Sequence, residues 1–163
     1  MNETLHFAVS QFLYKKSELC DAYDWDAYLD LYDESCEYHI PMWIDDHTYV
    51  KNPNEGLSYI YYEDRTGLED RVFRIRTGKA ASASVLPRTL HMLSNIIVNE
   101  TSSDEIEVRA LWQTLYDLRG VDKHFFGRVT YLLKRHDNSF KIYRQHTILL
   151  NDKIDSVLDF YHV

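Results

Sequence analysis

The order of apolar patterns along the chain predicts an α+β fold, with helices first and long strands last. Apolar residues recur at three- and four-residue steps near the N-terminus, as on one face of a helix. After residue 90 they alternate with polar residues over long stretches, as on strands. This order places the N-terminal helices on one face of a curled antiparallel sheet, which forms a half-open cone. The 163 residues contain no repeat and no linker-like segment, so we expect one domain over residues 1–163.

Three segments are expected to be helical. Residues 4–22 form the first helix, and Asp24 is a candidate N-cap for a second. One face of that second helix would carry Trp25, Tyr28, Leu29 and Tyr32. Gly67 precedes a third helix, whose apolar residues are Leu68, Val72, Phe73 and Ile75.

The first strand is expected where the apolar period changes from helical to alternating, at Cys36, Tyr38, Ile40 and Met42. Pro41 indicates a strand end or a sheet edge, because proline has no N–H to donate to a neighbouring strand. Residues 44–56 and 77–87 predict loops, and residues 57–62 form a short apolar patch between them.

Four strands are expected in the second half, at 90–98, 106–118, 124–134 and 140–150, with Gly127 as a candidate bulge. On the first of them, Leu90, Met92, Ile96 and Val98 would share one face. The face opposite the core would carry Leu111, Leu115, Tyr143 and Leu149. A sheet that is apolar on both faces needs a second cover, which a partner subunit would supply. In the tail we expect burial of Ile154, Val157, Leu158, Phe160 and Tyr161.

The net charge of −8 argues against nucleic acid or an anionic membrane as the main partner. The charge is uneven, since residues 1–70 hold 16 acids and 4 bases, whereas residues 71–163 hold 10 acids and 14 bases. Either the two halves neutralise each other within the fold, or they mark opposite faces for assembly. The sequence shows no signal peptide and no long apolar run, so we expect a cytoplasmic protein in which Cys20 and Cys36 are packed and inert.

The residues offer no sequence pattern for a metal site or a nucleotide site. A Rieske cluster needs two cysteines and two histidines at short spacings, and non-haem iron needs two histidines and a carboxylate. The full Rieske pattern does not occur, no histidine forms a His-x-Asp/Glu pair and no two histidines are four residues apart, which leaves only ligands that are distant in sequence. No phosphate-binding glycine motif is present. A cone could still hold an acid–base pocket for isomerase or dehydratase chemistry, with candidates Asp26, Tyr28, Tyr32, His39, His91 and Tyr116. The alternative for each is a packed or surface residue with satisfied hydrogen bonds.

The densest group of cations comprises Arg71, Arg74, Arg76 and Arg88. Guanidinium groups form bidentate pairs with carboxylates, so these residues are candidates for an ion-pair network within the fold or between subunits. The alternative is a solvated helix face, on which the preceding Glu69 and Asp70 supply partners at helical spacing.

The run from Tyr61 to Thr77, YYEDRTGLEDRVFRIRT, closely resembles a signature of the β subunits of aromatic-ring-hydroxylating dioxygenases. Pro87-Arg88-Thr89-Leu90-His91 with Asn95, the segment Asp24–Leu29 and the closing Asp159–Val163 also fit that family. The resemblance therefore covers essentially the whole chain. Within the family it is greatest to subunits of enzymes for aromatic carboxylates, with anthranilate as the first expected substrate and benzoate or toluate next.

The resemblance implies a cone-shaped fold similar to nuclear transport factor 2 and ketosteroid isomerase. It also implies a non-catalytic role in an α3β3 hexamer, with Arg71, Arg74, Arg76, Arg88, His91 and Asn95 as structural or assembly candidates. The Rieske [2Fe–2S] cluster and the mononuclear iron would lie on the large α subunit, with none on this chain, and a separate reductase would deliver electrons from NADH. Two other functions stay open from the residues alone: an independent isomerase or dehydratase, and a small-ligand binding protein.

Overall fold

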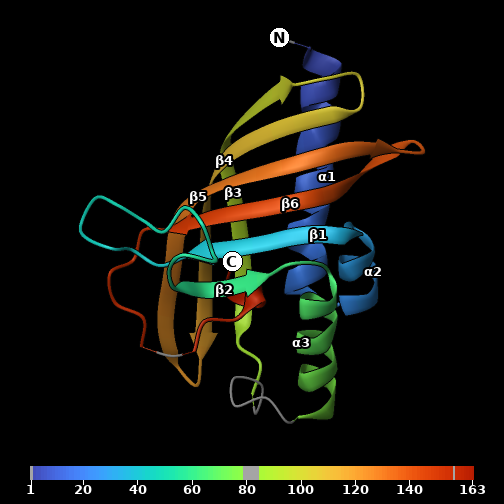
Figure 1. The fold of residues 1–163 in the computed structure, drawn as a ribbon. Coiled ribbons are helices and arrows are strands. Elements are labelled where there is room, and N and C mark those ends of the chain that lie inside the picture. The colour runs from blue at the N-terminus through green and yellow to red at the C-terminus, as the bar shows by residue number, and fades with distance from the viewer. Residues whose placement is uncertain (1, 79–84, 156) are drawn as a thin grey trace.

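The computed structural model describes residues 2–78, 85–155 and 157–163, so part of the loop predicted at 77–87 lies outside the described residues. Figure 1 shows helices packed on one side of a curled sheet. The elements are α1 (Glu3–Asp21), α2 (Trp25–Asp30), β1 (Tyr32–Pro41), β2 (Ser58–Tyr62), α3 (Thr66–Thr77), β3 (Arg88–Glu100), β4 (Glu105–Leu118), β5 (Val121–His136), β6 (Ser139–Leu149) and a 3₁₀ turn (Phe160–His162).

The six strands form one sheet in the order β2-β1-β6-β5-β4-β3, which confirms the predicted α+β class and the curled sheet. The prediction of a wholly antiparallel sheet is wrong at one pair, because β1 runs parallel to β6, with His39 opposite His146. These two strands are far apart in the sequence and no hairpin joins them. Alternation within each strand therefore carries no information on their relative direction.

The helix boundaries follow local capping. The Asn2 side chain accepts a hydrogen bond from the backbone N–H of Leu5 at the start of α1, and Asp24 accepts one from Ala27 at the start of α2. Gly78 ends α3 in the left-handed conformation, with φ of 66°. Tyr32 was expected on the second helix but is the first residue of β1, since Leu31 caps α2 and the chain turns there.

A bulge in β3 changes which residues face the core. Asn95 has φ of 53°, and the pairing with β4 shifts register between Ser94 and Ile97. His91 and Leu93 point inward before this bulge, whereas Ile96 and Val98 point inward after it. Leu90 and Met92 were predicted to share a face with Ile96 and Val98, which is wrong because the extra residue exchanges the faces.

Gly127 forms no bulge, contrary to the prediction, and pairs regularly with Trp112 and Leu149. A Cβ atom there would lie 2.0 Å from the backbone oxygen of Ile148, so the glycine permits close approach of β6. Two further expectations about burial are wrong. Leu149 lies in the core, because Leu132 and Leu133 pair with Arg144 and Ile142, so Tyr143 is an extra residue that exchanges the faces of β6, and Val157 is exposed.

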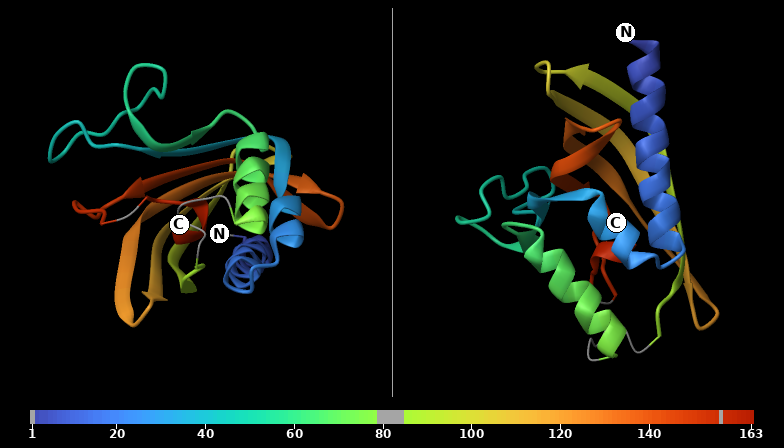
Figure 2. Two further views of the ribbon diagram at one scale, coloured as in Figure 1. Left: turned by 90° about the horizontal axis from the view of Figure 1, so that it is seen from below. Right: turned by 90° about the vertical axis from the view of Figure 1, so that its right-hand side faces the viewer.

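The main core lies between the concave face of the sheet and the helices, and the C-terminal segment enters it. Figure 2 shows this segment inside the cone. Leu158, Phe160 and Tyr161 are buried there, as predicted, and Ile154 is partly buried. None of the helices in the described part of the chain is both long and apolar enough to cross a membrane.

Candidate functional site

The interior of the cone is filled with aromatic side chains and the C-terminal segment. The Phe160 ring lies 5.3 Å from Trp25 and 5.6 Å from Tyr28, measured between centroids. The cavity that remains beside Lys16, His91 and Gln145 has a volume of about 10 Å³, roughly the space of one water molecule. This part of the interior therefore leaves no room for an organic substrate.

Tyr28 and Tyr32 form a buried hydrogen-bonded chain. Their hydroxyl oxygens are 2.9 Å apart, and Tyr32 donates to the side-chain oxygen of Gln145 at 2.8 Å. Burial raises the pKa of both phenols well above the usual value. Tyr116 is also buried, stacked on Phe125. Tyr28 and Tyr32 are therefore protonated core residues rather than acids at an open surface.

Asp21 links the end of α1 to β3 through hydrogen bonds. Its carboxylate accepts hydrogen bonds from the Thr89 hydroxyl (2.8 Å) and the His91 backbone N–H (3.0 Å), and it lies 2.5 Å from His91 Nδ1. Burial opposes ionisation of Asp21, but these hydrogen bonds outweigh it and the pKa of Asp21 lies below its usual value. Burial also lowers the pKa of His91. The geometry therefore fits a neutral His91 that donates from Nδ1 to the Asp21 carboxylate.

Cys20 lies beside this pair, with its sulfur 4.0 Å from His91 Nε2. The order thiol, imidazole, carboxylate matches the pattern of a nucleophile with its base and orienting acid. Burial, however, raises the pKa of Cys20 to about 12, so the thiol stays protonated. We interpret Cys20, His91 and Asp21 as a packed junction between α1 and β3.

Arg71 holds the C-terminal segment in the cone through an ion pair with Asp159, whose side chain is 1% exposed. Asp159 also accepts a hydrogen bond from the Phe160 backbone N–H, and its own backbone N–H donates to His162 Nδ1 at 2.9 Å. Burial lowers the pKa of His162 to about 4, so this histidine is neutral near pH 7.

The other predicted arginines do not gather with Arg71. Arg74 pairs with Asp70 one helical turn away, Arg76 pairs with Asp26, and Arg88 pairs with Asp117 across β3 and β4. These pairs are exposed, and the sequence cluster is dispersed over the surface. The acid–base candidate Asp26 is therefore a surface residue, and it lies outside the cone. Asn95 is exposed at the β3 bulge.

His39 faces the outer side of the sheet, so the six acid–base candidates do not converge. Its ring stacks on His146 with centroids 5.2 Å apart, and its Nε2 lies 2.9 Å from the Ser58 hydroxyl. Tyr61 and Tyr49 contact the two histidines from β2 and from the loop that precedes it. Burial lowers the pKa of both histidines. The alternation of β1, with Tyr38 and Ile40 inside, already indicates that His39 lies outside.

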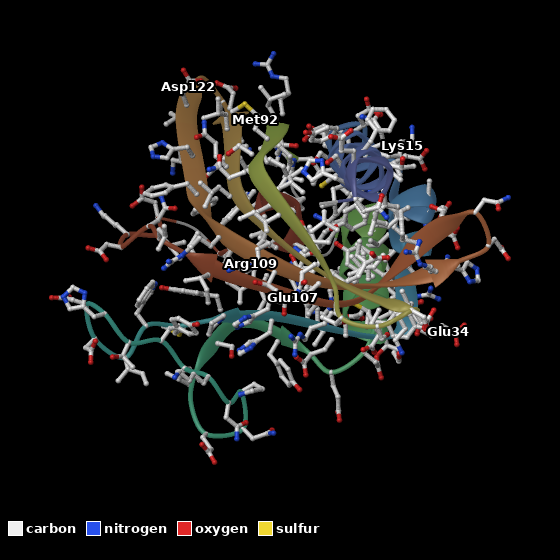
Figure 3. The ribbon with its side chains drawn as sticks, turned by 90° about the horizontal axis from the view of Figure 1, so that it is seen from above. Lys15, Glu34, Met92, Glu107, Arg109 and Asp122 are labelled. Carbon is white, nitrogen blue, oxygen red and sulfur yellow. The ribbon has the colours of Figure 1, made fainter. Side chains whose placement is uncertain are left out.

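A broad depression with a volume of about 840 Å³ runs along β3 and is lined by Tyr14, Ser17 and Glu18 of α1 as well as by residues of β3, β4 and β5. Its lining includes Leu90, Met92, Leu111, Phe126 and Leu150, and Leu115 continues the apolar surface beside it. Figure 3 shows Met92 on β3 and Arg109 on β4, with α1 and Lys15 on the other side of β3. Leu111 and Leu115 were predicted on the outer face from the alternation of apolar residues, whereas Leu90 and Met92 were not, because the alternation does not reveal the β3 bulge.

Within residues 2–78, 85–155 and 157–163, no group of three or more His, Cys, Asp or Glu side chains is placed so that it could hold a metal ion. The stacked pair of His39 and His146 supplies only two imidazoles.

Comparisons with known proteins agree with the fold and the resemblance. The anthranilate 1,2-dioxygenase small subunit of Acinetobacter baylyi is 68% identical over 163 residues, which cover all of both chains. The solved β subunit of benzoate 1,2-dioxygenase from Burkholderia mallei is 33% identical, covers 95% of each chain and superposes with a TM-score of 0.78. A protein of Novosphingobium aromaticivorans described as NTF2-like, with a cystatin-like fold, is 14% identical over 94% of this chain and 88% of its own. Its TM-score of 0.63 supports the fold alone.

A family model described as ring hydroxylating beta subunit matches residues 15–156, which is most of the chain. This match and the full-length relative confirm the family resemblance drawn from the run Tyr61–Thr77. They also favour the subunit interpretation over an independent isomerase or a small-ligand binding protein. The chain therefore belongs to the ring hydroxylating beta subunit family and is the small subunit of an aromatic-ring-hydroxylating dioxygenase.

Proposed function

We propose that this chain is the small subunit of an anthranilate 1,2-dioxygenase and that its role there is structural. The observation that carries this proposal is the 68% identity to an anthranilate 1,2-dioxygenase small subunit over the full length of both chains. Relatives described as benzoate or toluate 1,2-dioxygenase β subunits are 35–37% identical, so benzoate and toluate are the second choice of substrate. The complex would act in the cytoplasm.

The large subunit, in this proposal, holds the Rieske cluster and the mononuclear iron, and a separate reductase passes electrons to them from NADH. The loaded complex would add both atoms of dioxygen to anthranilate, with loss of carbon dioxide and ammonia, to give catechol. The ligand chemistry of the small chain supports this division. Among residues 2–78, 85–155 and 157–163, no three or more His, Cys, Asp or Glu side chains gather as possible metal ligands.

The small subunit would then contribute contact surface, in an assembly with α3β3 stoichiometry. The concave face of its sheet is filled, whereas the outer face exposes Leu90, Leu111 and Leu115. Exposed apolar patches of this kind are typical of protein interfaces. By holding large subunits in register, the chain would control the distance between redox centres without touching substrate.

Co-expression with the large subunit, followed by size and iron analysis, tests this proposal. We expect a complex near α3β3, with all iron on the large chain and a higher turnover of anthranilate than of benzoate. Asp26→Ala and His39→Ala should leave iron content and turnover unchanged. A chain that stays alone, or loss of turnover in an intact complex of either variant, would contradict the structural role. Benzoate as the better substrate would contradict the anthranilate assignment only.

A further inference from the structure

Two imidazoles and two phenols form a cluster on the outer face of β1 and β6, at the base of the loop between β1 and β2. His39 and His146 lie opposite each other on the parallel strands, with ring centroids 5.2 Å apart and an angle of 30° between the ring planes. Tyr61 meets His39 edge-on from β2 at 5.4 Å, and Tyr49 of the loop lies 6.1 Å from His146. The histidine pair is therefore a point at which the loop contacts the sheet.

The contact at Tyr49 continues into the loop, which spans residues 42–57. The Tyr49 ring meets Trp43 edge-on at 5.7 Å, and the Trp43 ring N–H donates to the Leu149 backbone oxygen at 2.7 Å. Figure 2 shows the loop extending away from the helices. The position of the loop therefore depends on aromatic contacts and hydrogen bonds at its base, and Tyr49 joins these to the histidine pair.

Both imidazoles favour the neutral form in this arrangement. Burial lowers the pKa of His39. Burial also lowers the pKa of His146, and the neighbouring His39 and Arg144 lower it further. Two neutral rings can stack at the observed separation, whereas protonation of both would place two cations there. The stack is therefore sensitive to pH in the range where histidine ordinarily titrates.

The strands around the pair supply little negative charge to offset a second proton. Glu37 on β1 favours protonation of His146, and Arg144 on β6 opposes it. On β5 the residue opposite His146 is Thr130, which does not titrate, and Arg109 of β4 lies opposite Thr130 one strand further. Among the described groups whose charge acts on His146, one carboxylate would thus face two imidazolium rings and a guanidinium.

The other partners of His39 do not supply the pH response. Its Nε2 lies 2.9 Å from the Ser58 hydroxyl, which can donate to a neutral ring or accept from a protonated one. Burial raises the pKa of Tyr61, so the phenol that meets His39 from β2 stays neutral. The charge that changes in mildly acidic solution is therefore that of the two stacked rings.

We propose that the stacked His39–His146 pair is an acid-sensitive contact, which holds the 42–57 loop on the sheet and releases it when both rings are protonated. His146 is more exposed than His39, so its ring is the one that moves toward solvent, and Tyr49 then loses its contact with the sheet. The released form binds protons more tightly, so the loop is held at high pH and is released as the pH falls. The inference concerns contacts within the chain and does not depend on the proposed function.

Spin labelling of the full-length chain tests the release by electron paramagnetic resonance. His47→Cys places one reactive thiol on the exposed part of the loop, because Cys20 and Cys36 are buried. When the pH is lowered from about 8 to about 5.5, the ratio of mobile to immobile label should rise at least about fourfold. This factor corresponds to the repulsion of two unit charges at 5.2 Å, weakened as in bulk water. Far-UV circular dichroism at both pH values establishes that the chain remains folded.

Two further substitutions in the labelled chain separate the histidine pair from other effects of acid. His146→Phe keeps a ring beside His39 that cannot be protonated, so its label should stay immobile at both pH values. His136→Gln, at the exposed hairpin between β5 and β6, is the matched control and should show the same rise as the parent. Equal label mobility at both pH values in the parent, or the same rise in His146→Phe, overturns the proposal.

Nuclear magnetic resonance of the histidine rings gives a second measurement that needs no variant at the pair. The ring signals of His39 and His146 should titrate below the ordinary range for histidine, and the signals of Tyr49 should shift with them. Titration of both rings within the ordinary range, with no change at Tyr49, overturns the proposal.

Discussion

The concave face of the sheet is closed within the chain, whereas its outer face on β3, β4 and β5 is left open. On the concave side, the aromatic side chains and the tail leave a cavity of about 10 Å³ beside His91 and Gln145. On the outer side, Leu90, Leu111 and Leu115 are exposed, and a depression of about 840 Å³ runs along β3 between this face and α1. Both faces are apolar, so apolarity alone does not separate core from interface. The difference is that the C-terminal segment covers only one of them.

The largest expected difference between the two faces comes from one substitution made on each. Phe160→Ala removes a fully buried ring from the cone and should lower the free energy of unfolding by about 3–5 kcal/mol. Phe126→Ala, on the outer face, should lower it by only about 1–2 kcal/mol, because Phe126 is 37% exposed. Urea unfolding of the isolated chain measures both. Equal losses of unfolding free energy in the two variants would contradict the distinction between a closed concave face and an open outer face.

Lowering the pH should destabilise the packing on the concave side of the sheet. The pKa of His162 is about 4 in the folded chain and lies near 6.5 when the chain is unfolded. Between these values the unfolded chain binds the additional proton, so stability is lost as pH falls from about 6.5 to about 4. The loss attributable to this residue would be about 3 kcal/mol. The pKa of His91 is also lowered, so it acts in the same direction.

Urea unfolding at several pH values measures this dependence. In His162→Asn, whose side-chain oxygen can still accept from the Asp159 backbone, the dependence on pH should be weaker. An unchanged slope in that variant would show that burial of His162 does not couple the tail to pH.

The ion pair that holds the tail should matter more than an ion pair on the surface of α3. Arg71→Ala leaves the Asp159 carboxylate buried and should cost about 1–3 kcal/mol of stability, since the Arg71 side chain is itself partly exposed. Arg74→Ala breaks an exposed pair and should cost less than about 0.5 kcal/mol. Thermal unfolding of the two variants compares them directly, and similar losses would argue against Arg71 as the residue that fixes the tail.

The smallest expected effect is the reaction of the two thiols. Cys20 and Cys36 are buried, and burial raises the pKa of each to about 12. We expect neither to react with a thiol reagent in the native chain at pH 8, and both to react after unfolding in urea. Rapid modification of a native thiol would show that the concave side opens readily.

The sequence alone determined the elements and the family. Three- and four-residue spacing identified α1, alternation identified β4, and the run Tyr61–Thr77 identified the relatives, because these features depend on neighbours in the chain. For the same reason, Leu111 and Leu115 could be placed on the outer face before the structure was known.

The tertiary structure alone decided which surfaces remain open. The positive φ at Asn95 moved Leu90 and Met92 to the outer face, and the Arg71–Asp159 pair fixed the tail inside the cone. The parallel pairing of β1 with β6 brought His39 next to His146. The β3 bulge, the direction of β1 and the pairing of Arg71 with Asp159, 88 residues later in the chain, each depend on contacts between distant segments. Local periodicity reports only on neighbouring residues and therefore does not predict such contacts.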